Sequence, residues 1–207
     1  MQNSKVSFTS RIIFTRCEDH IKENKKMYKN LEAGYPCTLK KCVFAPSAYT
    51  ESVRTCTAGG FVINQNGQRK ILMFHLDPNE LENLKLDNIQ KELIQKIGDN
   101  AVERALLMGS KDIKTSKGYE NSPLFFNFLE NFVQKLNIPY SKLQGLSERD
   151  CANLSYDGKS DTWKVSTKFT SYLRKDVFEQ KAKKAFEKVL IDKGDEFIIE
   201  QNPTGAK

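Results

Sequence analysis

Cys56 and His75 are the two residues of this chain whose types and spacing favour nucleophilic chemistry. They stand at the outer ends of two apolar segments, TCTAGGFVI and KILMFHL, which are joined by NQNGQR. Asn66-Gly67 between two such segments indicates a β-hairpin, because both residues tolerate the positive φ angles of a tight turn. A hairpin that turns there returns His75 to the end at which Cys56 begins, so we expect the thiol and the imidazole to meet.

A thiol beside an imidazole is an activated nucleophile, since the imidazole takes the proton and the thiolate attacks an acyl or amide carbonyl. A cysteine without such a neighbour is mostly protonated near neutral pH. Ala58, Gly59 and Gly60 follow the cysteine, and we expect them to leave room for a substrate and for backbone N–H groups that stabilise an oxyanion. The alternative interpretation is structural, with Cys56 as a buried strand cysteine and His75 as a polar residue at a strand end.

The segment around this pair resembles the active-site hairpin of CheD, a family of bacterial chemoreceptor glutamine deamidases. Its superfamily includes the catalytic domain of cytotoxic necrotizing factor and related toxins. The family carries a threonine six residues before its cysteine, then a strand, a turn, a second strand, and a histidine followed closely by a proline. The matching residues here are Thr50, Cys56, His75 and Pro78. The resemblance implies that Cys56 is the nucleophile, that His75 is the general base and acid, and that Thr50 orients His75 or lines the site.

The resemblance covers residues 40–168, more weakly away from the hairpin. It continues through three stretches, namely ALLMGS at 105–110, SPLFFNFLENFVQKLNIPYSKLQG at 122–145 and LSYDGKSDTWKV at 154–165. It implies a central, mostly antiparallel sheet or sandwich packed with helices. Because the sequence has no internal repeat and no low-complexity linker, we expect residues 1–207 to form a single α+β domain. Residues 1–39 and 169–207 are then additions to a CheD-like catalytic core, which either complete the sheet or form a surface for a partner.

The pair and the resemblance together predict a thiol-dependent protein glutamine deamidase, which converts a glutamine of a partner protein to glutamate through a thioester on Cys56. The same residues suit a transglutaminase or a cysteine peptidase, and a non-catalytic binding module on the same fold is the alternative from another class. The sequence departs from CheD at Arg54 and Thr55, where the family usually has a glycine-rich approach, and in a slightly longer turn. These departures favour a bacterial toxin or effector that acts on a host protein.

Composition is typical of a globular protein without a membrane span. The 207 residues are 39% hydrophobic and 29% charged, and no apolar run is long enough to cross a bilayer. The N-terminal residues lack the pattern of a secretory signal, so we expect a cytoplasmic protein that a specialised secretion system delivers to a host cell. The net charge of +7 is spread over lysines interleaved with acidic residues and accompanies no nucleic-acid-binding motif, so we predict no nucleic-acid partner.

The five cysteines indicate a reducing compartment, since an odd number in a chain of this size does not suggest a disulfide framework. Cys17, His20, Cys37 and Cys42 have the residue types of a zinc site. Their spacing is not that of a familiar zinc finger, and Cys42 falls in an apolar strand where burial explains it. We therefore expect neither a metal nor a cofactor.

Hydrophobic periodicity and turn residues predict the elements that position the pair. Helices are expected at 17–34, 77–98, 122–136 and 171–194. Strands are expected at 5–16, 40–46, 55–63, 70–76, 101–110, 138–146 and 195–201, with a second hairpin that turns at Asp157-Gly158.

Overall fold

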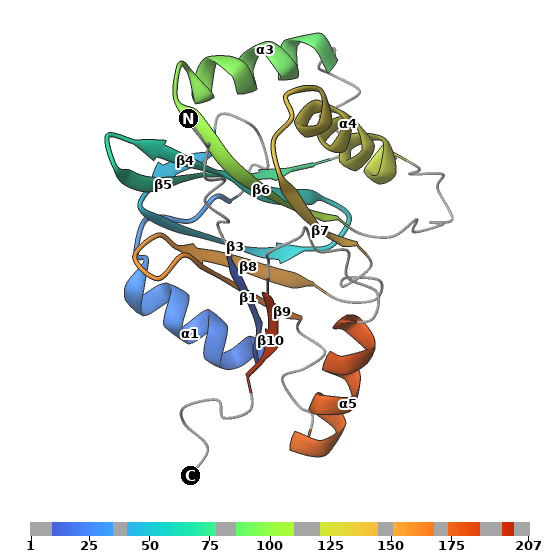
Figure 1. The fold of residues 1–207 in the computed structure, drawn as a ribbon. Helices are drawn as coiled ribbons and strands as arrows, with labels where there is room; N and C mark the ends of the chain where they lie inside the picture. The colour runs from blue at the N-terminus through green and yellow to red at the C-terminus, as the bar shows by residue number, and fades with distance from the viewer. Residues whose placement is uncertain are drawn as a thin grey trace, which may run out of the picture.

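The computed structural model describes residues 10–34, 41–77, 86–109, 121–144, 151–167, 174–186 and 196–200. These residues form an α+β structure (Figure 1). The helices are α1 (Cys17–Met27), α3 (Leu86–Ile97), α4 (Asn121–Lys135) and α5 (Lys175–Phe186). The strands are β1 (Arg11–Phe14), β2 (Val43–Ala45), β3 (Ser47–Val53), β4 (Thr57–Gln65), β5 (Gln68–Leu76), β6 (Ala101–Gly109), β7 (Tyr140–Gln144), β8 (Ala152–Asp157), β9 (Thr162–Thr167) and β10 (Glu196–Ile199).

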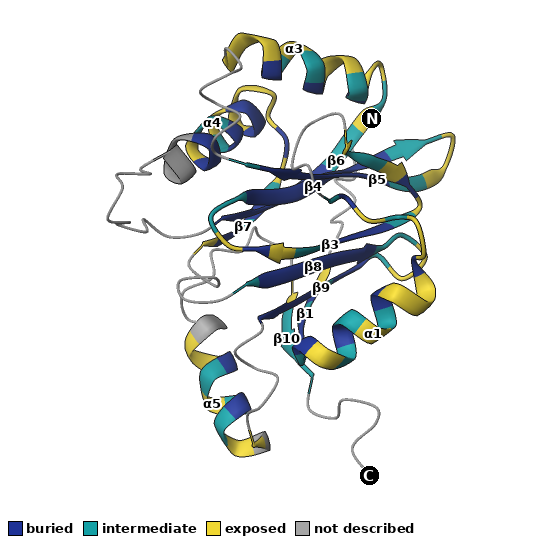
Figure 2. Ribbon diagram, turned by 180° about the vertical axis from the view of Figure 1, so that it is seen from behind, coloured by how far each residue is buried: buried dark blue, intermediate teal, exposed yellow. Residues whose placement is uncertain are grey.

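The strands form two mixed sheets that pack face to face. Sheet 1 has the order β10-β1-β9-β8-β3, and sheet 2 has the order β2-β5-β4-β6-β7. Helix α1 covers the outer face of sheet 1, whereas α3 and α4 cover the outer face of sheet 2 (Figures 1 and 2). Helix α5 lies at the β1 side, where the ring of Phe178 stacks on Phe14 with 5.8 Å between centroids. The sandwich is thus closed by helices on both outer faces.

Two hydrophobic clusters follow from this layering. The inner cluster lies between the sheets and includes Ala58, Met73, Leu154, Tyr156 and Trp163. The outer cluster joins sheet 2 to the helices above it through aromatic residues of α4 and aliphatic residues of α3, among them Phe125, Phe132, Ile89 and Leu93. Strands β4 and β5 are buried on both faces because they lie inside the layered structure, which explains their nearly continuous apolar sequence.

The predicted hairpin at Asn66-Gly67 is confirmed as β4–β5. The register runs from Thr57 opposite Leu76 to Gln65 opposite Gln68. Asn66 and Gly67 have φ angles of 54° and 80°, as a two-residue hairpin turn with both central residues at positive φ requires. The turn that the sequence indicated therefore sets which residues of the two strands face each other.

The terminal elements complete sheet 1 and do not form a separate unit within the described residues. Strand β1 pairs in parallel with β9 on one side and with β10 on the other.

In α3, Leu86 and Ile94 are 44% and 46% exposed, so the apolar face of this helix is narrower than its sequence suggests. Pro78 and the start of the predicted helix at 77–98 lie outside the described residues. No helix in the described part of the chain is long and apolar enough to span a membrane.

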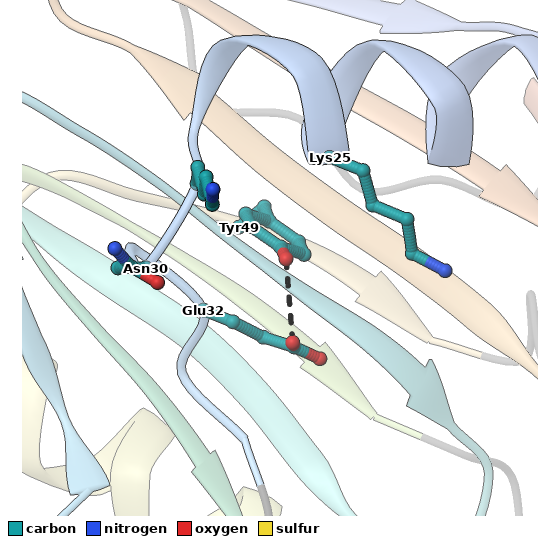
Figure 3. Close-up of a pocket in the computed structure, with 5 residues that line it drawn as sticks. Lys25, Asn30, Glu32 and Tyr49 are labelled. Atoms are coloured by element: carbon teal, nitrogen blue, oxygen red, sulfur yellow. Dashed lines mark hydrogen bonds between the residues drawn. The ribbon is translucent and has the colours of Figure 1, made fainter.

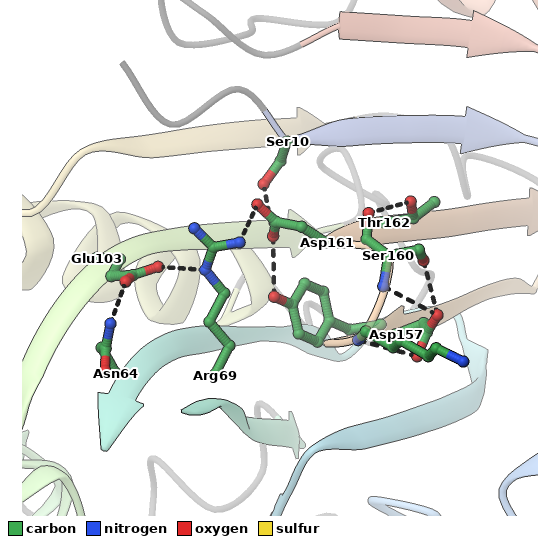
Figure 4. A network of polar contacts seen from close by, with 10 residues as sticks. Ser10, Asn64, Arg69, Glu103, Asp157, Ser160, Asp161 and Thr162 are labelled. Atoms are coloured by element: carbon green, nitrogen blue, oxygen red, sulfur yellow. Dashed lines mark hydrogen bonds and ion pairs between the residues drawn. The ribbon is translucent and has the colours of Figure 1, made fainter. Parts of the chain in front are cut away.

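A polar network joins the two sheets at the turn end of the β4–β5 hairpin (Figure 4). Arg69 of β5 contacts Glu103 of β6 with 2.7 Å between Nε and Oε2. Its Nη1 is 3.2 Å from Oδ2 of Asp161, which lies in the turn between β8 and β9. The hydroxyl of Tyr156 donates to the other oxygen of Asp161 at 2.9 Å. The guanidinium thus bridges carboxylates of both sheets, at the end of the hairpin opposite His75.

Replacing Arg69 by Ala is expected to lower the free energy of unfolding by about 1–3 kcal/mol, because it leaves two largely buried carboxylates without their charged donor. Urea unfolding measures this change. The matched control is Arg11→Ala, because Arg11 and Glu196 are more than half exposed and 4.0 Å apart, and loss of that pair should change stability by less than about 0.5 kcal/mol. Equal effects in the two variants would contradict a role for the network in holding the sheets together.

Candidate active site

The structure brings Thr50 and His75 into direct contact. His75 lies near the end of β5 in sheet 2 and is 5% exposed, and Thr50 lies on β3 in sheet 1 and is fully buried. The Thr50 Oγ1 and His75 Nδ1 atoms are 2.8 Å apart, at hydrogen-bond distance. This contact crosses from one sheet to the other, so the relative placement of the sheets fixes the orientation of the imidazole.

Within the described part of the chain, the second ring nitrogen of His75 has no hydrogen-bond partner. Nε2 is buried and makes no hydrogen bond within the described chain. Leaving a buried polar group unpaired costs about 1–3 kcal/mol, so such an atom calls for an explanation. In the neutral tautomer with a proton on Nδ1, Thr50 accepts the hydrogen bond and Nε2 carries the lone pair. An imidazole held in this way is a base that can take a proton from a neighbour.

Cys56 lies one residue before β4, in the bend that connects β3 of sheet 1 to β4 of sheet 2. From the sequence we expected Cys56 to lie at the start of the strand predicted at 55–63, whereas β4 begins one residue after it. Ala58, two residues further on, is the register partner of His75. Cys56 packs against the inner cluster, to which Ala58 also belongs.

Cys56 is partly exposed as a residue, so it is not sealed in the interior. Its side chain lies toward the space between the sheets, the side on which Thr50 meets His75. Residues from β3, the β3–β4 bend and β5 are therefore gathered at one end of the sandwich. The structure shows no hydrogen bond between the expected pair, because Nε2 of His75 is without a partner in the described chain, so Cys56 lies at the same end as His75 without a hydrogen bond to that ring nitrogen.

The expected space beside Gly59 and Gly60 is not present. A Cβ atom on Gly59 would overlap the backbone carbonyl oxygen of Leu106, and one on Gly60 would come within 2.6 Å of the Ile71 side chain. Both glycines therefore allow close packing of β4 against its neighbours. They do not open room for a substrate, and this part of the sequence interpretation was wrong.

The residues considered for a zinc site are used differently. His20 lies on the buried face of α1 and is fully buried, and its two ring nitrogens are each 2.8 Å from a serine hydroxyl, those of Ser155 and Ser166. The sulfur of Cys17 accepts a hydrogen bond from Asn153 at 3.2 Å. Cys37 lies outside the described residues, and Cys42 packs beside the outer cluster. Within the described ranges, no three His, Cys, Asp or Glu residues form a group that could hold a metal.

Burial, together with the nearby charge of Lys164, lowers the pKa of His20 to about 3. The imidazole is therefore neutral at physiological pH and serves as a hydrogen-bonding member of the core. Sequence reasoning missed this network. The signal that could have revealed it is the alternation of polar and apolar residues in β8 and β9, where Asn153, Ser155 and Ser166 face α1.

A pocket of about 370 Å³ opens between the end of α1 and β3 (Figure 3). It is lined by Lys25, Lys29, Asn30, Glu32 and Tyr49. The Tyr49 hydroxyl donates to Oε2 of Glu32 at 3.3 Å, and burial together with the Glu32 charge raises the pKa of Tyr49 to about 12. This pocket contains none of the three residues that the sequence predicted for the active site.

The pocket and the candidate active site lie on opposite faces of β3. Tyr49 and Thr50 are consecutive residues of this strand, and successive side chains of a strand point to opposite faces. Thr50 faces the inside of the sandwich, where it contacts His75. The pocket is therefore separated from the thiol by sheet 1 and is not a substrate site for Cys56.

No protein-family model matches the sequence, and no similar chain was found among curated proteins or among solved structures. Function is therefore inferred from the geometry of the three residues Thr50, Cys56 and His75 and from the resemblance in their spacing.

Proposed function

We propose that this protein is a thiol-dependent protein glutamine deamidase. The observation that carries the proposal is the 2.8 Å contact between Thr50 and Nδ1 of His75, with Nε2 buried and without a hydrogen-bond partner in the described chain. An imidazole with one nitrogen held by a polar side chain and the other available to take a proton is the common logic of catalytic triads. The spacing of the three residues in the sequence adds the resemblance to CheD.

The reaction proceeds in two halves. His75 takes the proton of Cys56, and the thiolate attacks the carboxamide carbon of a glutamine side chain. The imidazolium then returns its proton to the departing nitrogen, so that ammonia leaves and a thioester on Cys56 is formed. In the second half, His75 removes a proton from water, which attacks the thioester. The products are glutamate on the partner and the regenerated thiol.

The partner is proposed to be a protein that carries one accessible glutamine. The chemistry uses no metal or cofactor, and it requires a reduced thiol. Cys17, Cys42, Cys56 and Cys151 are all thiols in the structure, which agrees with a reducing compartment such as cytoplasm. The departures from CheD at Arg54 and Thr55 favour a host protein over a chemoreceptor, and hence a role as an effector or toxin.

Mass spectrometry of candidate partner proteins tests this proposal. Partners are incubated with the wild-type protein and with Cys56→Ser, and their peptides are searched for conversion of glutamine to glutamate. We expect conversion at one glutamine with the wild type only. Cleavage of the partner backbone would show a peptidase instead, and an amine joined to the glutamine would show a transglutaminase. Conversion that persists with Cys56→Ser would contradict the mechanism.

Cys56 is also expected to alkylate at pH 7 at least about 10-fold faster than Cys42 or Cys151, because a neighbouring base increases its thiolate fraction. Cys42 and Cys151 are matched controls, since they have the same intermediate exposure. Timed labelling with iodoacetamide followed by peptide mapping measures each rate separately. Similar rates at all three positions would favour a binding module that does not use the thiol.

A further inference from the structure

A β-bulge follows Thr50 directly. Strands β3 and β8 are in register at Thr50 and again at Val53, but the register shifts between them, so Glu51 and Ser52 together oppose the single residue Asn153. Ser52 has a φ angle of 61°, which is uncommon for a residue with a side chain. Bulges of this kind occur often beside active sites, where they redirect a side chain.

The side chain of Asn153 supports this bulge. Its Oδ1 atom accepts a hydrogen bond from the backbone N–H of Ser52 at 3.0 Å, and Asn153 is only 2% exposed. The bulge removes Ser52 from the regular ladder between the strands, so its backbone N–H needs another acceptor, which the Asn153 side chain supplies. The amide of Asn153 therefore stabilises the left-handed conformation of Ser52.

The orientation of the Asn153 amide is itself fixed by two other elements. Its Nδ2 donates to Sγ of Cys17 on α1 and to Oγ of Ser166 on β9, both at 3.2 Å. With Nδ2 held by these two acceptors, Oδ1 is the atom directed at Ser52. Reversal of the amide would place the NH₂ group against the Ser52 N–H, two donors facing each other, and lose that hydrogen bond.

We propose that Asn153 is a positioning residue for the Cys56 and His75 pair, acting through the bulge at Ser52. The bulge lies within the six-residue step from Thr50 to Cys56, along which the chain leaves sheet 1 for sheet 2. Fixing Ser52 sets both the direction of the Thr50 hydroxyl toward Nδ1 and the path of the bend that presents the thiol. This inference rests on the proposed function and extends it to a residue that contacts neither the substrate nor the reacting atoms.

The test compares Asn153→Ala, the double variant Asn153→Ala with Ser52→Gly, and the control Ser155→Ala. Ser155 is a buried polar residue on the same face of β8 that does not touch the bulge. Two readouts are used, the rate of Cys56 alkylation by iodoacetamide as a function of pH and the ¹⁵N shifts of the His75 ring. Thr50→Val supplies the reference ring shifts for a broken hydrogen bond to Nδ1.

In Asn153→Ala, we expect Cys56 alkylation at pH 7 to fall about 10- to 100-fold, as a small misplacement of reacting groups does. The ¹⁵N shifts should move toward those of Thr50→Val. Glycine at position 52 adopts a positive φ without a Cβ penalty, so the double variant should regain most of the lost rate. Ser155→Ala should keep the wild-type rate and ring shifts even if it lowers the melting temperature.

Unchanged rate and ring shifts in Asn153→Ala would overturn the inference. So would equal losses in Asn153→Ala and Ser155→Ala, because these would show general destabilisation. If Cys56 of the wild-type protein alkylates no faster than Cys151, the proposed function fails, and this result is distinct from the two outcomes above. The His75 ring shifts still test Asn153 in that case, since they report the Thr50 hydrogen bond whatever the thiol does.

Discussion

The His75→Ala variant is expected to convert glutamine about 10²- to 10⁴-fold more slowly than the wild type, the range that a general acid–base residue contributes. Its Cys56 should alkylate at pH 7 at the rate of an ordinary thiol. The reason is that Nε2 is the ring nitrogen without another hydrogen-bond partner in the described chain. Partner conversion is measured by mass spectrometry, and thiol reactivity by timed labelling.

Thr50→Val is the matched variant for this prediction, since it keeps the size of the side chain and removes the hydroxyl that contacts Nδ1. It should slow conversion less than His75→Ala does, because the base is still present but is no longer fixed in tautomer and orientation. A conversion rate in His75→Ala that equals the wild type would remove the imidazole from the mechanism.

The parts of this site that depend on local sequence could be predicted. The Asn66-Gly67 turn specifies its own geometry, and the turn fixes the register that places Ala58 opposite His75. That register alone places Cys56 and His75 at the same end of the hairpin. The α+β class also follows from local patterns, since each predicted helix overlaps one of the helices in the structure.

The parts that depend on pairing between distant residues could not be predicted from periodicity. Strand β3 was not expected, because its bulge at Glu51 and Ser52 interrupts the alternation that marks a strand. Its pairing with β8 joins residues about a hundred positions apart, and this pairing brings Thr50 to the face that meets His75. The resemblance in spacing named Thr50, but only the packing of two sheets gives its hydroxyl a partner.

Gly59 and His20 show how the same residue type can serve packing or chemistry. Glycines beside a cysteine suggested space for a substrate, whereas the backbone of Leu106 occupies the space beside Gly59. A histidine three residues after a cysteine suggested metal ligands, whereas both its nitrogens meet serine hydroxyls. In each case the deciding contact comes from a strand that is distant in sequence, so composition and spacing alone could not distinguish the two uses.

The protein is expected to lose stability steeply below pH 6, and His20 is expected to be a main cause. Its pKa is lowered from 6.5 to about 3 by burial, assisted by Lys164. Between these values the unfolded chain binds a proton at this residue and the folded chain does not, so acid favours unfolding. The contribution of His20 is fully present above pH 6.5 and decreases as the pH falls toward 3, by about 1.4 kcal/mol per pH unit.

Urea unfolding of the wild type and of His20→Gln between pH 7 and pH 4.5 measures this effect. Glutamine keeps a donor and an acceptor for Ser155 and Ser166 but does not titrate. The variant is expected to be less stable than the wild type at pH 7, because its amide cannot reproduce both 2.8 Å contacts. Its stability should nevertheless change less with pH, so that by pH 5 the difference between the two proteins narrows by about 2 kcal/mol. Parallel pH profiles would show that His20 is accessible to protons in the folded state, contrary to its complete burial between α1 and sheet 1.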